Sequence, residues 1–77
     1  MLSLSNKWTE YLRSQAETGL GYQVVTIKTS DGKIFHQAVV DSGYLTRIRG
    51  FREIPFTQEE IEDITVTHDK WDWKNER

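Results

Sequence analysis

Residues 22–40, YQVVTIKTSDGKIFHQAVV, decide the fold of this 77-residue chain. The first half of the stretch is rich in β-branched residues, which favour a pleated strand over a helix. Asp31-Gly32 then indicates a tight turn, because Gly reaches positive φ without steric cost and Asp bonds to its own backbone. A second apolar run begins at Ile34. The stretch therefore predicts an antiparallel hairpin with strands at 22–29 and 33–40.

Both faces of this hairpin carry apolar side chains. Strict alternation places Val25 and Ile27 on one face of the first strand and Val24 on the other. In the second strand, alternation groups Phe35, Gln37 and Val39 on one face and Ile34, His36, Ala38 and Val40 on the opposite one. We expect one face to line a barrel and the other to lie under an N-terminal helix or a partner chain.

Residues 4–18 have the pattern of an amphipathic helix. Leu4, Trp8, Tyr11 and Leu12 recur at helical spacing, and Gly19 is placed as a left-handed C-cap. We expect the stripe that contains Trp8 to pack on the sheet rather than to bind a ligand.

The second half of the chain predicts further short strands, at 44–49, 53–56 and 64–68. Alternation in the first of these separates Thr46 and Ile48 from Leu45, Arg47 and Arg49. Pro55 places the 53–56 strand at an edge, because it lacks a backbone donor. Thr57 and Glu60 form a capping box that predicts one helical turn. Residues 1–70 are expected to form one small domain, and 71–77 a polar tail.

The order of a helix, short antiparallel strands and one helical turn before the last strand resembles the small SH3-like and Sm-like β-barrels. The stretch VTIKTSDGKIFHQAV is similar to the first Sm motif around its Asp-Gly turn, and Ile48-Arg49-Gly50 is similar to the second. Sm proteins usually carry a Gly in the second strand where this chain has Gln37. The resemblance implies an α+β fold, with an N-terminal helix packed on a four- to five-stranded antiparallel barrel or curved sheet. Sm kinship would also imply RNA binding.

Composition excludes several classes of function. The chain has no Cys, which removes disulfides, thiolate catalysis and Cys-based zinc sites. MLSLSNKW is too short and polar for a signal peptide, and no apolar run reaches membrane-spanning length, so the cytoplasm is expected and a membrane partner is not. Residues 22–52 hold five basic and two acidic residues, whereas 53–77 hold three basic and eight acidic ones. This asymmetry favours internal neutralisation, head-to-tail association, or a basic face for an anionic partner.

The segment from Tyr44 to Arg52 is the first candidate binding site. Its side chains of interest are three arginines with two flanking aromatics: Tyr44, Arg47, Arg49, Phe51 and Arg52. Guanidinium groups beside aromatic rings suit single-stranded nucleic acid, because phosphates pair with the former and bases stack on the latter. The alternative is surface pairing of these arginines with the acids that follow them in the sequence, worth about 0–1 kcal/mol a pair.

Trp71 and Trp73 are the second candidate. In an extended tail both indoles face the same way, and Trp is enriched at interaction hot spots. The alternative is that the tail folds back and the indoles close the open end of the barrel near Trp8 or Tyr11.

Metal binding and catalysis are not expected. His36, His68, Asp69 and Asp72 lack the spacing of a metal site, and no phosphate loop, nucleophile elbow or paired-acid signature is present. The sequence therefore predicts a non-enzymatic interaction module without a cofactor, which binds a protein partner or itself as a homodimer. The alternative is a small protein that binds RNA or single-stranded nucleic acid.

Overall fold

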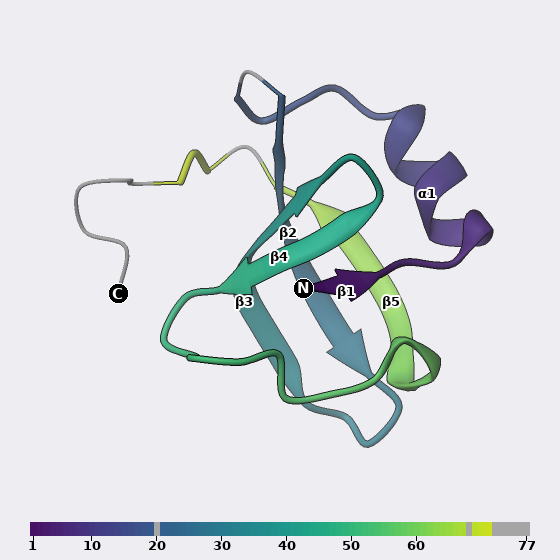
Figure 1. Ribbon diagram of the computed structural model, residues 1–77, viewed down its shortest axis with the longest axis vertical. Helices are drawn as coiled ribbons and strands as arrows, with labels where there is room; N and C mark the ends of the chain where they lie inside the picture. The colour runs from purple at the N-terminus through teal and green to yellow at the C-terminus, as the bar shows by residue number, and fades with distance from the viewer. Residues whose placement is uncertain (20, 68, 72–77) are drawn as a thin grey trace.

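The fold is one helix on a single curled sheet. The computed structural model describes residues 1–19, 21–67 and 69–71. In that part of the chain, α1 (Asn6–Arg13) accompanies five antiparallel strands in the spatial order β1-β4-β3-β2-β5. The strands are β1 (Leu2–Ser3), β2 (Gln23–Thr29), β3 (Ile34–Asp41), β4 (Tyr44–Ile48) and β5 (Ile61–Val66). The sheet curls into a half-barrel (Figure 1), which confirms the predicted α+β class and is compatible with small barrel folds.

The inner side of the half-barrel holds the main core. Trp8 and Leu12 of α1 are 8% and 4% exposed, and they belong to the same buried cluster as the inward residues of β2 to β5. The prediction that Trp8 packs on the sheet is confirmed. The cluster consists of Leu4, Trp8, Leu12, Val25, Ile27, Phe35, Ala38, Val40, Leu45, Ile48, Phe56, Ile61 and Ile64.

A bulge in β3 overturns the strict alternation predicted for this strand. Val25 pairs with Ala38 but Ile27 pairs with Phe35, so β3 carries one extra residue between the two pairs. Gln37 absorbs it with a φ of +58°, in the left-handed region that Gly adopts most easily. Phe35 therefore faces the core with Ala38, and not the same side as Val39, with which alternation grouped it.

A similar irregularity lies in β4. Val39 pairs with Arg47 and Val40 with Leu45, so Thr46 is the extra residue there. Leu45 consequently joins Ile48 in the core, whereas alternation had separated the two.

The outer face of the hairpin is covered, but not by the helix. Val24 and Val39 form a small second cluster with Trp71, and Tyr22 packs against it. The expectation that α1 lies over this face is wrong for Val24 and Val39, because Trp8 and Leu12 of α1 belong to the inner core instead. The other alternative, a partner chain over this face, stays a prediction. Trp71 packs here rather than beside Trp8 or Tyr11, which contact each other at a ring-centroid distance of 6.2 Å.

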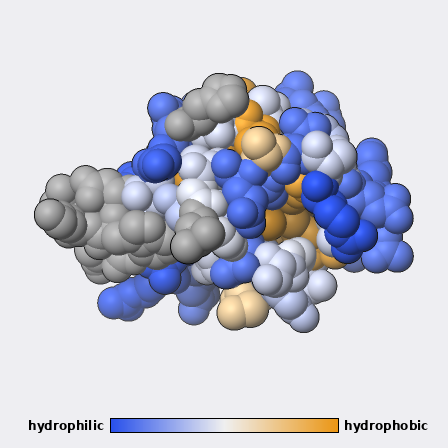
Figure 2. Space-filling view, turned by 90° about the horizontal axis from the view of Figure 1, so that it is seen from above, coloured by the Kyte–Doolittle hydropathy of each residue, from blue (hydrophilic) through white to orange (hydrophobic). Residues whose placement is uncertain are grey.

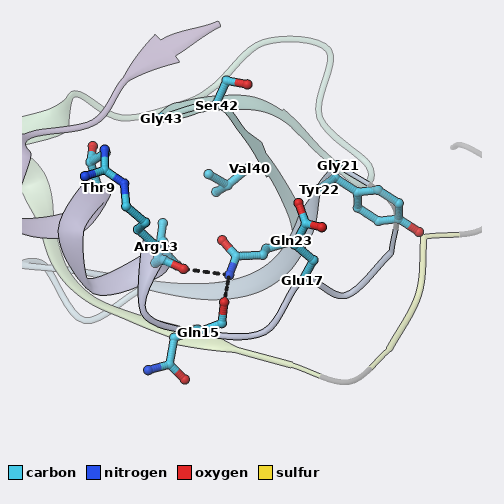
Figure 3. A pocket seen from close by; sticks show the side chains of 11 residues that line it. Thr9, Arg13, Gln15, Glu17, Gly21, Tyr22, Gln23, Val40, Ser42 and Gly43 are labelled. Carbon is cyan, nitrogen blue, oxygen red and sulfur yellow. Dashed lines mark hydrogen bonds between the residues drawn. The ribbon is translucent and has the colours of Figure 1, made fainter.

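The helix is shorter than the predicted 4–18 because Gln23 holds its end. The side-chain nitrogen of Gln23 donates to the carbonyls of Leu12, Gln15 and Ala16 at 2.9, 3.2 and 3.2 Å. The first two of these hydrogen bonds are drawn in Figure 3. In the described chain, Gln23 is the donor on which the Gln15 and Ala16 carbonyls depend, whereas the Leu12 carbonyl also accepts from the Gln15 backbone N–H at 3.1 Å. Ser14 is the C-cap, and the predicted left-handed C-cap at Gly19 is not found, because Gly19 has no positive φ.

Two strands differ from their predicted positions. No strand occurs at 53–56 within the described chain, because the backbone turns at Ile48–Phe51, with Gly50 at φ +86°, and Pro55 lacks a donor. Ile54 and Phe56 pack against the core without joining the sheet. The last strand is β5 at Ile61–Val66, which begins earlier than predicted.

The helical turn predicted before the last strand is confirmed. It is a 3-10 turn, η1 (Gln58–Glu60), where the Thr57 backbone N–H donates to Glu60 Oε1 at 2.8 Å. β1 is too short to leave a sequence pattern, and it pairs with β4 through Leu2 and Ser3. None of the helices in the described residues has the length and apolar character needed to cross a membrane.

Candidate functional site

The predicted binding residues divide between two places. Tyr44, Arg47, Arg49 and Trp71 lie on the outer face of the sheet. Phe51 lies over the start of β3, and Arg52 is exposed next to it in the chain. Trp73 lies outside the described residues. The two places have different geometry and are described in turn.

The outer-face group is built around Trp71. Its indole is 4% exposed and packs on Val24 and Val39. The guanidinium carbon of Arg49 lies 4.1 Å from the centroid of the Trp71 ring, within the range of a cation–π contact. Trp71 is therefore a packed side chain covered by an arginine.

The turn after β4 places Arg49. Phe51 N–H donates to the Ile48 carbonyl at 3.0 Å, and Gly50 supplies the positive φ that this reversal requires. Arg49 N–H donates to the Gln37 carbonyl at 3.0 Å, which ties the turn to the bulge of β3. Gln37 and Gly50, the two residues with positive φ, therefore act together to hold Arg49 over the Trp71 indole.

Arg47 and Tyr44 share this outer face. Arg47 is exposed and pairs across the sheet with Val39, whose side chain contacts Trp71. Tyr44 precedes the inward Leu45, so its side chain points outward, and it is 44% exposed.

Phe51 belongs to a separate depression, which we call the Phe51 hollow. It has a volume of about 470 Å³. Phe51 contacts the buried Phe35 edge to face at 5.4 Å, and Phe35 contacts Phe56 at 5.0 Å. The residues that line the hollow are Lys33, Ile34, Phe35, His36, Gln37, Arg49 and Phe51.

Two apolar side chains of the hollow face solvent. Ile34 is 55% exposed and Phe51 is 47% exposed. Sequence reasoning found Phe51 but missed Ile34, Lys33 and His36 as its neighbours. The bulge at Gln37 brings these residues together. It could not be predicted from residue preferences, because Gln seldom adopts a positive φ.

An open strand edge runs beside the hollow. β4 pairs with β3 only over Ala38–Asp41, so in the described chain no strand borders Ile34 and His36 on that side. Thr29 N–H donates to the Lys33 carbonyl at 3.0 Å, which directs the backbone of Lys33 toward β2. By antiparallel alternation the backbone N–H and C=O of Ile34 point away from β2, toward the open edge.

The charge around the hollow is basic. Lys33 and Arg49 are among its lining residues, and Arg52 is exposed one position beyond Phe51. The nearby Asp31 lies 3.8 Å from Lys33, and both side chains are more than half exposed. The Thr29 hydroxyl and then the Lys33 backbone N–H donate to Asp31 and lower the pKa of its carboxyl below the ordinary 3.8.

A cluster of side chains that could hold a metal ion is not found in the described part of the chain. There, no group of three or more His, Cys, Asp or Glu side chains converges. His36 Nδ1 lies 3.3 Å from the Thr26 hydroxyl on the exposed surface, and His68 is outside the described residues.

Comparison of the chain with protein-family models, with curated proteins and with solved structures finds no match. Any function must therefore be argued from the chain's own surfaces.

Proposed function

We propose that this chain is a non-enzymatic interaction module that binds an extended segment of a protein partner at the Phe51 hollow. The observation that carries the proposal is the joint exposure of Ile34 and Phe51 beside an open edge of β3. Large apolar side chains grouped on a surface mark interaction sites more often than single ones do. An open strand edge adds backbone hydrogen bonds to such a site, as in peptide recognition by strand addition.

The rim supports a partner of defined chemistry. Lys33 and Arg49 border the hollow, and residues 22–52 carry a net excess of three basic residues. Charge complementarity favours a segment with an aromatic or aliphatic anchor flanked by Asp or Glu. The apolar anchor would fill the space beside Phe51, and the acids would face Lys33 and Arg49.

Peptide display tests this proposal. A random peptide library is selected against the wild-type chain and counter-selected against Phe51→Ser and Ile34→Thr, which keeps a β-branched residue in the strand. Tyr44→Ser is the matched control, because Tyr44 is exposed to a similar degree on a face outside the hollow. We expect enriched peptides to carry an acid-flanked apolar residue and to lose binding to the two hollow variants only. Peptides that bind all variants equally would overturn the proposal.

A single-stranded nucleic acid is the second candidate for the same surface. The observation in its favour is the exposed Phe51 ring between Lys33 and Arg49, since bases stack on aromatic rings while phosphates meet cations. The net charge of −2 weakens this alternative, because long-range attraction of a polyanion is lost. Solution mass measured by light scattering with a mixed oligonucleotide at low and high salt separates the two candidates. A dimer that persists at high salt would instead identify a second copy of the chain as the partner.

A further inference from the structure

A second depression lies at the opposite end of the hairpin and shares no lining residue with the Phe51 hollow. It opens between the end of α1, the start of β2 and the β3–β4 turn at Ser42 and Gly43 (Figure 3). We call it the α1-end pocket. Its volume of about 450 Å³ is within the range of small-molecule sites, about 300–1,000 Å³. On this end of the molecule, hydrophobic residues lie set back between hydrophilic ones (Figure 2).

Gln23 gives the pocket a fixed acceptor. This side chain is 8% exposed, and its amide nitrogen donates to three carbonyl oxygens at the end of α1. Because carbonyl oxygens only accept, the atom that faces them must be the nitrogen, which settles the orientation of the amide. The amide oxygen then points away from the helix end and toward the pocket (Figure 3). The three hydrogen bonds hold it there before any ligand arrives.

Two opposite charges border the same pocket. Arg13 and Glu17 both line it and are both exposed. Four residues apart on a helix they would pair, but α1 ends at Arg13 and the chain turns away. In the described chain neither side chain lies within 4.0 Å of an oppositely charged partner. The pocket therefore offers one cation, one anion and one neutral acceptor, with both charges still available to a ligand.

We propose that the α1-end pocket binds a small zwitterion of the α-amino-acid class. The ligand carboxylate pairs with the Arg13 guanidinium, and its ammonium donates to the Glu17 carboxylate and to the Gln23 amide oxygen. A simple anion would be repelled by Glu17, and a simple cation by Arg13, so the charge arrangement selects a molecule that carries both charges. Leu12 and Val40 give the lining its apolar part, beside which a ligand side chain can lie.

Chemical-shift titration tests the proposal on the ¹⁵N-labelled chain. The probes are glycine, L-alanine, L-serine and L-leucine, with acetate and methylammonium as single-charge controls. We expect one or more amino acids to shift the Gln23 side-chain amide and the backbone signals of Ser42 and Gly43, and the single-charge compounds to leave them in place. Equal shifts from acetate or methylammonium, or no shift with any amino acid, would overturn the proposal.

Paired variants locate the contacts. Arg13→Gln and Glu17→Gln each remove one charged hydrogen bond and should weaken binding about tenfold. Lys7→Gln and Glu10→Gln are the matched controls, since they make the same charge changes on α1 outside the pocket lining. Unchanged affinity in both pocket variants would refute the assigned contacts. Peptide binding at the Phe51 hollow is independent of this result, because the two depressions share no residue.

Discussion

Arg49 lies over Trp71, with 4.1 Å between its guanidinium carbon and the ring centroid. This contact joins the turn after β4 to the last residue that the structure describes. It gives Arg49 a packing partner on the outer face, in addition to its place on the rim of the Phe51 hollow. A substitution of Arg49 therefore changes stability as well as any binding that the arginine performs.

Trp71→Ala should lower the free energy of unfolding by about 3 kcal/mol, because it removes a buried indole from Val24 and Val39. Arg49→Ala should cost less, about 1 kcal/mol, since it removes the cation–π contact and leaves the indole in place. Urea denaturation measures both. Trp71→Phe is the control that keeps an aromatic ring on the two valines, and it should recover part of the stability. A Trp71→Ala chain as stable as the wild type would contradict the packing of this side chain.

Gln23→Leu should destabilise the fold by about 1–3 kcal/mol, although leucine is apolar and similar in size. The reason is that the Gln15 and Ala16 carbonyl oxygens lose their donor, while the Leu12 carbonyl keeps the Gln15 backbone N–H. Gln15→Leu makes the same chemical change at an exposed position and should alter stability by less than about 0.5 kcal/mol. Thermal or urea unfolding followed by circular dichroism compares the two. Equal stability of both variants would show that the Gln23 amide does not hold the helix end.

The sequence predicted the parts of the fold that depend on local chemistry. The Asp31-Gly32 turn, the stripe through Trp8 and the capping box at Thr57 each follow from residue preferences within a few positions. The position of Phe35 could not be predicted, because it depends on one extra residue in β3 that only the pairing with β2 reveals. The same is true of the helix end, where a glutamine eleven residues away from Leu12 supplies the donor.

The candidate site shows the same division. Composition and spacing selected Arg49, Phe51 and Trp71, but pairing across the sheet decides which of them lie together. Trp71 packs under Arg49, whereas Phe51 turns to the other side of the Ile48–Phe51 reversal and meets Phe35. Ile34 could not be predicted as a site residue, because its exposure beside Phe51 depends on β4 pairing with only part of β3.

Gln37→Gly should raise the free energy of unfolding by about 0.5 kcal/mol. A residue with a side chain destabilises the folded state by roughly 1–2 kcal/mol in the left-handed region, and Gly removes this strain. Gly also gives the unfolded chain more conformational entropy, which offsets about 0.5–1 kcal/mol of the gain in stability. Gln37→Val should destabilise by about 1–3 kcal/mol, because a β-branched residue resists a φ of +58°. Urea denaturation of the two variants gives opposite signs if the bulge is at this position. Equal effects would place the extra residue of β3 elsewhere.

Asp31→Asn should remove a pH-dependent contribution to stability. The Thr29 hydroxyl and the Lys33 backbone N–H lower the pKa of the Asp31 carboxyl in the folded chain below 3.8. A lowered folded pKa means that the contribution is present above the unfolded value of 3.8 and is lost as the pH falls through the folded value. The wild type should therefore exceed Asp31→Asn in stability at neutral pH, and the difference should shrink in strong acid. A difference that stays constant with pH would assign it to packing rather than to charge.

Arg47 and Arg52 test nucleic-acid binding, because the sequence predicts that they contact phosphates and neither lines the Phe51 hollow proposed to hold a peptide. Under the proposed protein-binding function, a mixed single-stranded oligonucleotide should leave the solution mass of the chain unchanged at low salt. If the oligonucleotide binds instead, the double variant Arg47→Gln/Arg52→Gln should reduce the salt dependence of log affinity by about 0.7 for each phosphate that an arginine no longer neutralises. Lys7→Gln/Arg13→Gln removes the same two charges from α1 and is the matched control. Oligonucleotide binding that weakens only in the first double variant would favour nucleic acid over a protein segment as the partner of the chain, because the proposed peptide faces Lys33 and Arg49 rather than Arg47 or Arg52.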